Sequence, residues 1–417
     1  MFQNSGLSLD QAPPINVVLR FFLTGAIFGI IGSIMLFFWS DSIKEISNPK
    51  TLAIVHTFTL GVMASFMLGA LFQMMPVLCG VAIKAPNELS LRVNYALLFG
   101  TLFLIISFIK TSTALYVLAF IFLSYAIFMA ALTMIYKLNK IEHSSSSRGM
   151  LIALISLIIT ALMGLTLLSI RIGAPLNIDY TKLKYIHFSF GLFGWIALLI
   201  ISVSFQVIEM FYVTPPYNKR YTKVIPTIIF TTLIIYAFSL FITDILLFLP
   251  YIVTFLIALH AIFTLYNLKR KKRPINDATV WFWTLGMVAL ILFFIVSVLK
   301  INTILSATLF SIFALSIMFA MSYKIVPFLV WFHLNAKGYF DAPMMHEVVS
   351  PKYARVNLYL FLVASILSIC SIFYTKIYYI SSAILLLSFL MLAIAIYQAL
   401  NKYYYTLKHG KRLEFSF

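Results

Sequence analysis

The chain has 417 residues, of which 62% are hydrophobic and only 10% are charged. Soluble globular domains are nearer half apolar and a quarter charged, so this composition excludes a soluble enzyme, a disordered tail and a secreted disulfide scaffold. A net charge of +18 would suggest nucleic-acid binding in a soluble protein. Here the basic residues separate long apolar runs, which indicates a polytopic membrane protein with no nucleic-acid partner.

Twelve apolar runs are long enough to cross a bilayer core of ~30 Å as helices of about 20 residues. They lie at approximately 19–39, 51–75, 92–109, 112–136, 149–170, 184–208, 222–243, 246–267, 279–299, 303–326, 356–374 and 377–400. No basic segment precedes the first run and no small-residue cleavage pattern follows it, so we expect a retained helix rather than a signal peptide. We therefore predict an all-α integral membrane protein of about 12 transmembrane helices in a single domain.

Basic residues are distributed unequally between the two ends of these spans. Of the 30 Lys and Arg residues, 22 lie on the side of the termini and the even-numbered connections, and 8 lie on the other side. Because basic residues collect on the cytoplasmic side, we expect both termini to be cytoplasmic, in a bacterial inner membrane. The run Lys269 to Arg273 belongs to this signal and could also contact anionic lipid.

Spans two and six share a pattern at a shift of 133 residues, which superposes Gly61 on Gly194 and Phe72-Gln73 on Phe205-Gln206. The end of span ten, Tyr323-Lys324 to Pro327, matches the end of span two at a shift of 251. These matches predict three four-helix units, approximately 15–136, 148–267 and 278–400, related by a pseudo-threefold axis. The alternative is chance similarity among apolar segments that use few residue types.

Two of the seven histidines, His56 and His187, fall at similar depth near the outer ends of spans two and six. Ionisable side chains inside a membrane are costly, and imidazole suits iron or copper, so we interpret this pair as metal ligands. The alternative is a pair of interfacial histidines that hydrogen-bond to neighbouring helices. Gly191 and Gly194 share a helix face with His187 and would let a flat macrocycle approach. Met63 could serve copper through its thioether, although methionine at helical spacing is usually core filler.

With these motifs the sequence resembles subunit I of the haem-copper oxidase superfamily, whose twelve helices have pseudo-threefold symmetry. The stretch from Tyr185 to Pro216 looks like the helices of cbb3-type oxidases and nitric-oxide reductases, and the chain is also similar to the NnrS family. The resemblance implies that His56 and His187 ligate one non-covalent haem b in the outer half of the bundle, with copper as a further metal. It also implies a cytochrome or quinol as electron donor, and a role in respiratory electron transfer or the nitric-oxide response.

The chain departs from the oxidase pattern where the dinuclear centre would be. Span seven contains no histidine, and neither does span ten before Lys324. The full set of oxidase ligands is absent, so we expect a reduced cofactor set, and an oxidoreductase, if it is one, that does not reduce dioxygen in the standard way. The alternative function is a 12-helix secondary transporter without a redox cofactor.

The inner ends of the three repeat-related spans carry Gln73, Gln206 and Lys324 at equivalent positions. These groups could form a polar relay on the pseudo-threefold axis, with Glu209 near enough to pair with Lys324 or with Arg220. The alternative is that Lys324 extends to the cytoplasmic headgroups and the glutamines bond to backbone.

Three further features have simpler expectations. The connection 331–347 mixes aromatic, acidic and His residues and could bind a metal or a partner, but it is more typical of an amphipathic interfacial segment. We expect His260 to pack or to form a hydrogen bond. The two cysteines, Cys79 and Cys370, are expected to be packing residues, because two thiols form no CxxC motif or disulfide framework.

Overall fold

The structure is a computed structural model that describes residues 12–242, 244–272 and 275–412. Within these residues it has twelve helices long and apolar enough to cross a membrane, which confirms the predicted fold class. Arg273, the last residue of the predicted basic run, lies outside the described residues.

Each predicted apolar run coincides with one span. Span one is α1 (Ile15–Trp39); span two joins α2 (Pro49–His56), η3 (Thr57–Ala64) and α3 (Ser65–Cys79); spans three to five are α4 (Pro86–Lys110), α5 (Thr113–Leu138) and α6 (Ser145–Ile172). Span six joins α7 (Tyr180–Ser189), η4 (Phe190–Ala197) and α8 (Leu198–Tyr212); spans seven to nine are α9 (Lys219–Ile242), α10 (Leu249–Lys269) and α11 (Ala278–Val298). Spans ten to twelve are α12 (Thr303–Ala336), α14 (Pro351–Cys370) and α15 (Ile377–His409); the short elements are η2 (Ser40–Lys44), η5 (Asp244–Leu246) and α13 (Met345–Val348).

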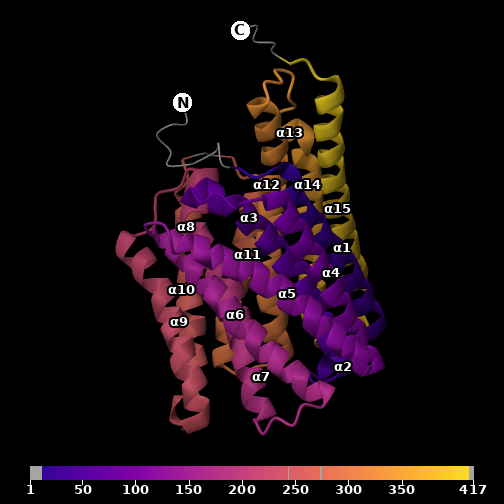
Figure 1. The fold of residues 1–417 in the computed structure, drawn as a ribbon, viewed down its shortest axis with the longest axis vertical. Helices are drawn as coiled ribbons and strands as arrows, with labels where there is room; N and C mark the ends of the chain where they lie inside the picture. Colours follow the sequence, from indigo (N-terminus) through magenta and orange to yellow (C-terminus); the bar gives the residue numbers. More distant parts are fainter. Residues whose placement is uncertain (1–11, 243, 273–274, 413–417) are drawn as a thin grey trace.

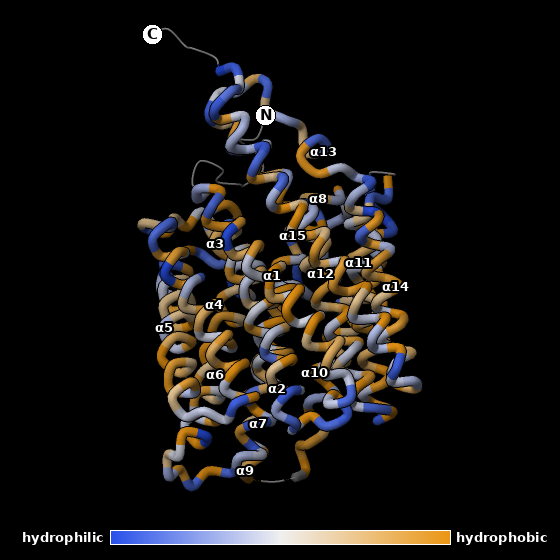
Figure 2. The backbone as a smooth tube through the Cα atoms, turned by 90° about the vertical axis from the view of Figure 1, so that its right-hand side faces the viewer, coloured by the Kyte–Doolittle hydropathy of each residue, from blue (hydrophilic) through white to orange (hydrophobic). Residues whose placement is uncertain are grey.

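Two helices extend furthest beyond the predicted ends of their apolar runs. α12 continues past the predicted end at 326 to Ala336, and α15 continues past 400 to His409. Counting apolar residues detects only the part of a helix inside hydrocarbon, so it misses turns that extend into the polar layer. Figure 2 shows the end of α15 rising beyond the bundle, with hydrophilic residues gathered at both ends of the molecule.

Spans two, six and ten are the innermost helices. Their apolar segments are 83%, 78% and 61% buried, whereas no other span exceeds 56%. α1 packs against α15, so the first and last spans are neighbours, and α1 begins where α15 ends, at the same end of the bundle (Figure 1). The spans most buried in the structure are therefore those that the sequence repeat relates.

Spans two and six also share an irregular backbone. In η3 and η4 the helix widens to the π form for eight residues each, and both the first and the last residues of the two segments differ by 133 positions. This is the shift that relates the two spans in sequence, so the repeated residues accompany a repeated local structure. Span ten is α-helical throughout.

Candidate functional site

The two histidines of the inner helices lie beside each other near one end of the bundle. His56 ends α2 and His187 lies in α7, and each stands seven residues after the first residue of its helix, Pro49 or Tyr180. Figure 1 shows α2 and α7 at the same end, opposite the start of α1. The two imidazole centres are 6.2 Å apart and the ring planes differ by 19°. The two histidines predicted to lie at similar depth are thus neighbours at one end of the bundle.

Hydrogen bonds determine which ring nitrogen of each histidine is free. Nδ1 of His56 lies 2.8 Å from the carbonyl oxygen of Leu52, and Nδ1 of His187 lies 2.9 Å from that of Thr160 in α6. A carbonyl only accepts, so each Nδ1 carries the hydrogen and donates it. In the neutral imidazole this leaves the Nε2 lone pair free, which is the arrangement found in metal-ligating histidines. These two hydrogen bonds are compatible both with a pair of metal ligands and with a pair of interfacial histidines that bond to neighbouring backbone.

Residues from the neighbouring helices shape the space around the imidazoles. The ring of Phe108 lies 5.2 Å from that of His56, and the guanidinium of Arg171 lies 5.5 Å from the Phe108 ring. At Gly164, a Cβ would lie 2.8 Å from Cε1 of His187. A side chain at position 164 would therefore displace the imidazole, which makes this glycine part of the site.

The separation of the two imidazole centres, 6.2 Å, is short enough for both histidines to contribute to one metal site. Metal–imidazole bonds are about 2.0–2.1 Å long. The donor set of two neutral imidazoles suits copper or haem iron.

The glycines of span six are packed against a helix. A Cβ at Gly191 would lie 3.2 Å from Cγ2 of Thr160, and a Cβ at Gly194 would lie 2.8 Å from Cβ of Ser156. Side chains of α6 thus occupy the face that we expected a macrocycle to approach, because the glycines let α6 come close. Met63 is buried in η3, as a core residue would be.

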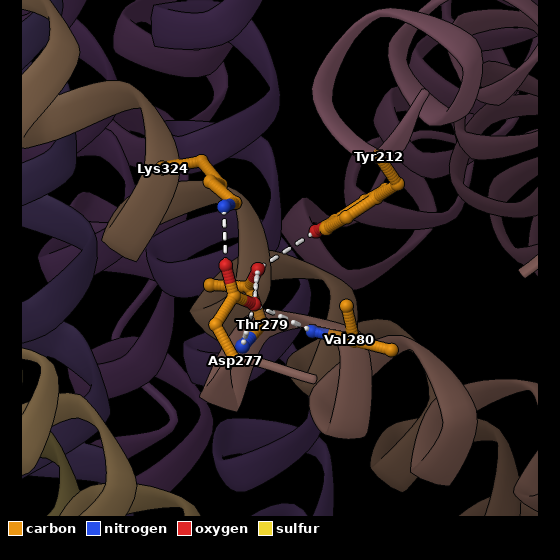
Figure 3. Close-up of polar contacts among 5 residues, drawn as sticks. All are labelled: Tyr212, Asp277, Thr279, Val280 and Lys324. Atoms are coloured by element: carbon orange, nitrogen blue, oxygen red, sulfur yellow. Dashed lines mark hydrogen bonds and ion pairs between the residues drawn. The ribbon is translucent and has the colours of Figure 1, made fainter. Parts of the chain in front are cut away.

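A second polar site lies at the opposite end of the bundle, where three helices meet (Figure 3). Lys324 Nζ donates to Asp277 Oδ2 at 2.5 Å. Oδ1 of Asp277 accepts from the backbone N–H groups of Thr279 and Val280, which caps α11, and from the Thr279 hydroxyl at 2.6 Å. The Tyr212 hydroxyl donates to the Thr279 hydroxyl at 2.9 Å. One carboxylate therefore ties together α8, α11 and α12.

This ion pair corrects the prediction for the inner ends. Lys324 pairs with Asp277, and no ion pair to the exposed Glu209 occurs among the described residues, because Glu209 faces outward from α8. Gln73 is buried with no hydrogen-bond partner for its Oε1 in the described part of the chain, and Gln206 is half-buried. The Lys324 side chain is only 18% exposed and directed to Asp277, so it neither extends to the headgroups nor joins the two glutamines.

A third polar cluster surrounds His260, which is fully buried in α10. The Tyr221 hydroxyl lies 2.9 Å from Nδ1, and Nε2 lies 3.0 Å from the Ser204 hydroxyl and 3.2 Å from that of Thr264. Ser204 and Thr264 each donate to a carbonyl of their own helix, so Nε2 carries the hydrogen and Nδ1 accepts from Tyr221. The expectation of a hydrogen-bonded His260 is confirmed, and the cluster joins α8, α9 and α10.

The connection 331–347 packs against the end of the last helix. Its first residues, through Ala336, belong to α12, and the Tyr339 hydroxyl donates to the carbonyl of Leu407 in α15. No group of three His, Cys, Asp or Glu that could hold a metal occurs in the described parts of the chain. Nε2 of His333 is buried with no partner there. The structure thus places this connection on α15 and gives it no donor cluster for a metal.

The sequence did not identify the residues that contact the two imidazoles. Gly164 and Thr160 carry no signal in an apolar run, since their importance arises from the approach of α6 to α7. Asp277 did carry a signal, because Asp followed by an apolar helix predicts an N-cap. No protein-family model matches the chain, and no curated protein matches it.

Proposed function

We propose that this chain is a membrane protein that holds a redox-active metal, as haem b or copper, between His56 and His187. It is related to subunit I of the haem-copper oxidases and acts in respiratory electron transfer or the nitric-oxide response. The observation that carries the proposal is the geometry of the two imidazoles, 6.2 Å apart with each Nδ1 bonded to a carbonyl.

The chain's own residues supply binding, orientation and a protected environment. Each carbonyl fixes the tautomer and the rotation of its imidazole, and hydrogen bonds of this kind raise ligand affinity by about 10–100-fold. Gly164 leaves the space that the His187 ring needs, and Phe108 covers His56 beside the cation of Arg171. A bound iron or copper would supply one-electron chemistry at this place. Of the two, a bare copper ion needs no space beside the packed glycine face of span six.

The position of the pair suggests the side from which electrons arrive. With the termini cytoplasmic in a bacterial inner membrane, as the 22-to-8 distribution of basic residues indicates, the histidines lie near the outer surface. A cytochrome on that side, or a quinol within the bilayer, could then serve as donor.

The experiment is metal analysis and a visible spectrum of the purified protein, with His56→Ala and His187→Ala as test variants. We expect a Soret band or stoichiometric copper in the wild type and at least a tenfold loss of metal affinity in each variant. His143→Ala is the control, since this histidine is exposed in the connection between α5 and α6 and its removal opens no cavity. Wild-type protein from metal- and haem-sufficient cells with neither signal would refute the proposal. It would favour the alternative of a secondary transporter without a redox cofactor.

A further inference from the structure

A hollow of about 610 Å³ lies between α4 and α5, on the outside of the bundle. Its walls are almost entirely apolar and aromatic, with Leu91, Tyr95 and Phe99 from α4 and with Phe122 and Tyr125 from α5. Ligand sites typically have volumes of about 300–1,000 Å³ and walls of this kind. A second hollow of about 330 Å³ continues along α5 and shares Tyr125 with the first, so the two form one groove.

Aromatic rings give the groove a defined shape. Tyr95 stacks on Phe99 with ring centres 6.3 Å apart, and Phe99 meets the edge of Phe122 at 6.3 Å. Tyr95 is 50% exposed and Phe99 is 43% exposed, so both rings face outward rather than into the bundle. On a membrane-spanning helix that direction is hydrocarbon. The contacting rings form one wall of the hollow, against which an acyl chain can lie.

The charge in the groove is at one end. Arg92 lines the hollow six residues after Pro86, where α4 begins, on the side of the bundle that carries 22 of the 30 basic residues. Its partner Glu88 is 3.6 Å away, and both side chains are mostly exposed. Exposed pairs of this kind contribute little, so the Arg92 guanidinium remains open to a stronger anion.

We propose that this groove is a specific site for one anionic phospholipid of the leaflet on the basic side. An acyl chain lies in the hollow against the rings of Phe99 and Phe122, and the phosphate group meets the guanidinium of Arg92. The charge favours an anionic occupant. The guanidinium can bind the phosphate of any phospholipid, but the quaternary ammonium of a zwitterionic headgroup such as phosphatidylcholine is repelled by the same cation. The site is separate from the histidine pair and does not depend on a bound metal.

Native mass spectrometry of the detergent-purified chain, titrated with phosphatidylglycerol and with phosphatidylcholine, tests the site. We expect the first phosphatidylglycerol molecule to bind with higher affinity than those that follow. Phosphatidylcholine should bind with lower affinity than this first phosphatidylglycerol. Arg92→Gln removes the cation and lowers the affinity for phosphatidylglycerol about fivefold, which is the effect of ~1 kcal/mol per basic residue. Ile121→Trp fills the hollow from an exposed position on α5, so it weakens both lipids.

The matched control is Arg355→Gln, because Arg355 is exposed in the first turns of α14 on the same side but lines neither hollow. It should bind phosphatidylglycerol like the wild type. Equal losses in Arg92→Gln and Arg355→Gln would mean a general effect of surface charge and would overturn the proposal. So would equal affinity for both lipids, or a dimer that occludes the groove and binds no lipid. Thermal midpoints of all variants show whether a loss of binding reflects unfolding instead.

Discussion

Removal of the Asp277 carboxylate should destabilise the end of the bundle opposite the histidine pair. Two separate interactions are lost, and two variants distinguish them. The carboxylate caps α11 through the N–H groups of Thr279 and Val280, and it accepts the Lys324 ammonium at 2.5 Å. Asp277→Asn keeps an oxygen that can cap the helix but loses the charge. Asp277→Ala loses both.

The magnitudes follow from the two kinds of contact. Loss of an N-cap side chain costs about 1 kcal/mol. A hydrogen bond to a charged group contributes about 1.5–3 kcal/mol, and the 37% exposure of Asp277 places it at the lower end, near ~1.5 kcal/mol, because solvent screens the pair. We therefore expect Asp277→Asn to cost ~1.5 kcal/mol and Asp277→Ala ~2.5 kcal/mol. Lys324→Met should be milder than Asp277→Asn, since the carboxylate keeps its bonds to Thr279.

The same pair predicts a pH dependence. Burial alone would raise the pKa of Asp277, but the hydrogen bonds from Lys324 and Thr279 hold it below the ordinary value. A carboxyl whose pKa is lowered on folding stabilises the protein above its unfolded pKa of about 3.9, and this stabilisation is lost as the pH falls through the folded pKa. The difference in stability between wild type and Asp277→Asn should be constant at neutral pH and should vanish in acid.

Unfolding by sodium dodecyl sulfate in mixed micelles, followed by tryptophan fluorescence, measures these free energies. The double variant Asp277→Asn/Lys324→Met completes a thermodynamic cycle, from which we expect a coupling energy of about 1–2 kcal/mol. A coupling below about 0.5 kcal/mol would refute the argument, since contacting charged residues couple more strongly than that. An unchanged difference between wild type and Asp277→Asn at low pH would refute the assignment of the lowered pKa.

Two further predictions concern the helices around the sites. His260→Ala should destabilise the chain by about 2–4 kcal/mol in the same assay, because it opens a cavity and leaves the Tyr221 hydroxyl unpaired. Deletion of Leu60, in η3, should restore an α-helix and keep the flanking turns in register, since a π segment holds about one residue more than an α segment of the same length. Deletion of Leu71, in the regular helix α3, should instead rotate the part of span two before residue 71 by about 100° relative to the part after it. This variant should elute from size-exclusion chromatography as several species rather than as one.

The spans could be predicted from the sequence because hydrophobic length is a local property. All twelve runs found by counting apolar residues are helices, and the errors are at the ends, as in α12 and α15. The inner position of spans two, six and ten could be predicted because a repeat in sequence reports equivalent places in a bundle. Neither inference required knowledge of how the side chains pack.

The polar partners could be predicted only where both groups lie in spans that the repeat relates. His56 and His187 were found through their equal depth, whereas Lys324 was assigned the wrong partner. Asp277 lies in a connection, just before α11, and the repeat says nothing about connections. The roles of individual glycines could not be predicted either. Gly164 and Gly194 both allow close contact with a neighbouring helix, and only the structure shows that Gly164 borders an imidazole and Gly194 a serine.

The histidine pair is a departure from the repeat rather than a product of it. At the shift of 133 that superposes η3 on η4, His56 corresponds to Ser189 and His187 corresponds to Ile54. The two histidines are therefore not at equivalent positions, and yet they stand equally far from the starts of their helices with rings 6.2 Å apart. The two imidazoles therefore meet from non-equivalent positions, each with its Nδ1 bonded to a carbonyl, and the shared metal that we propose would account for this arrangement.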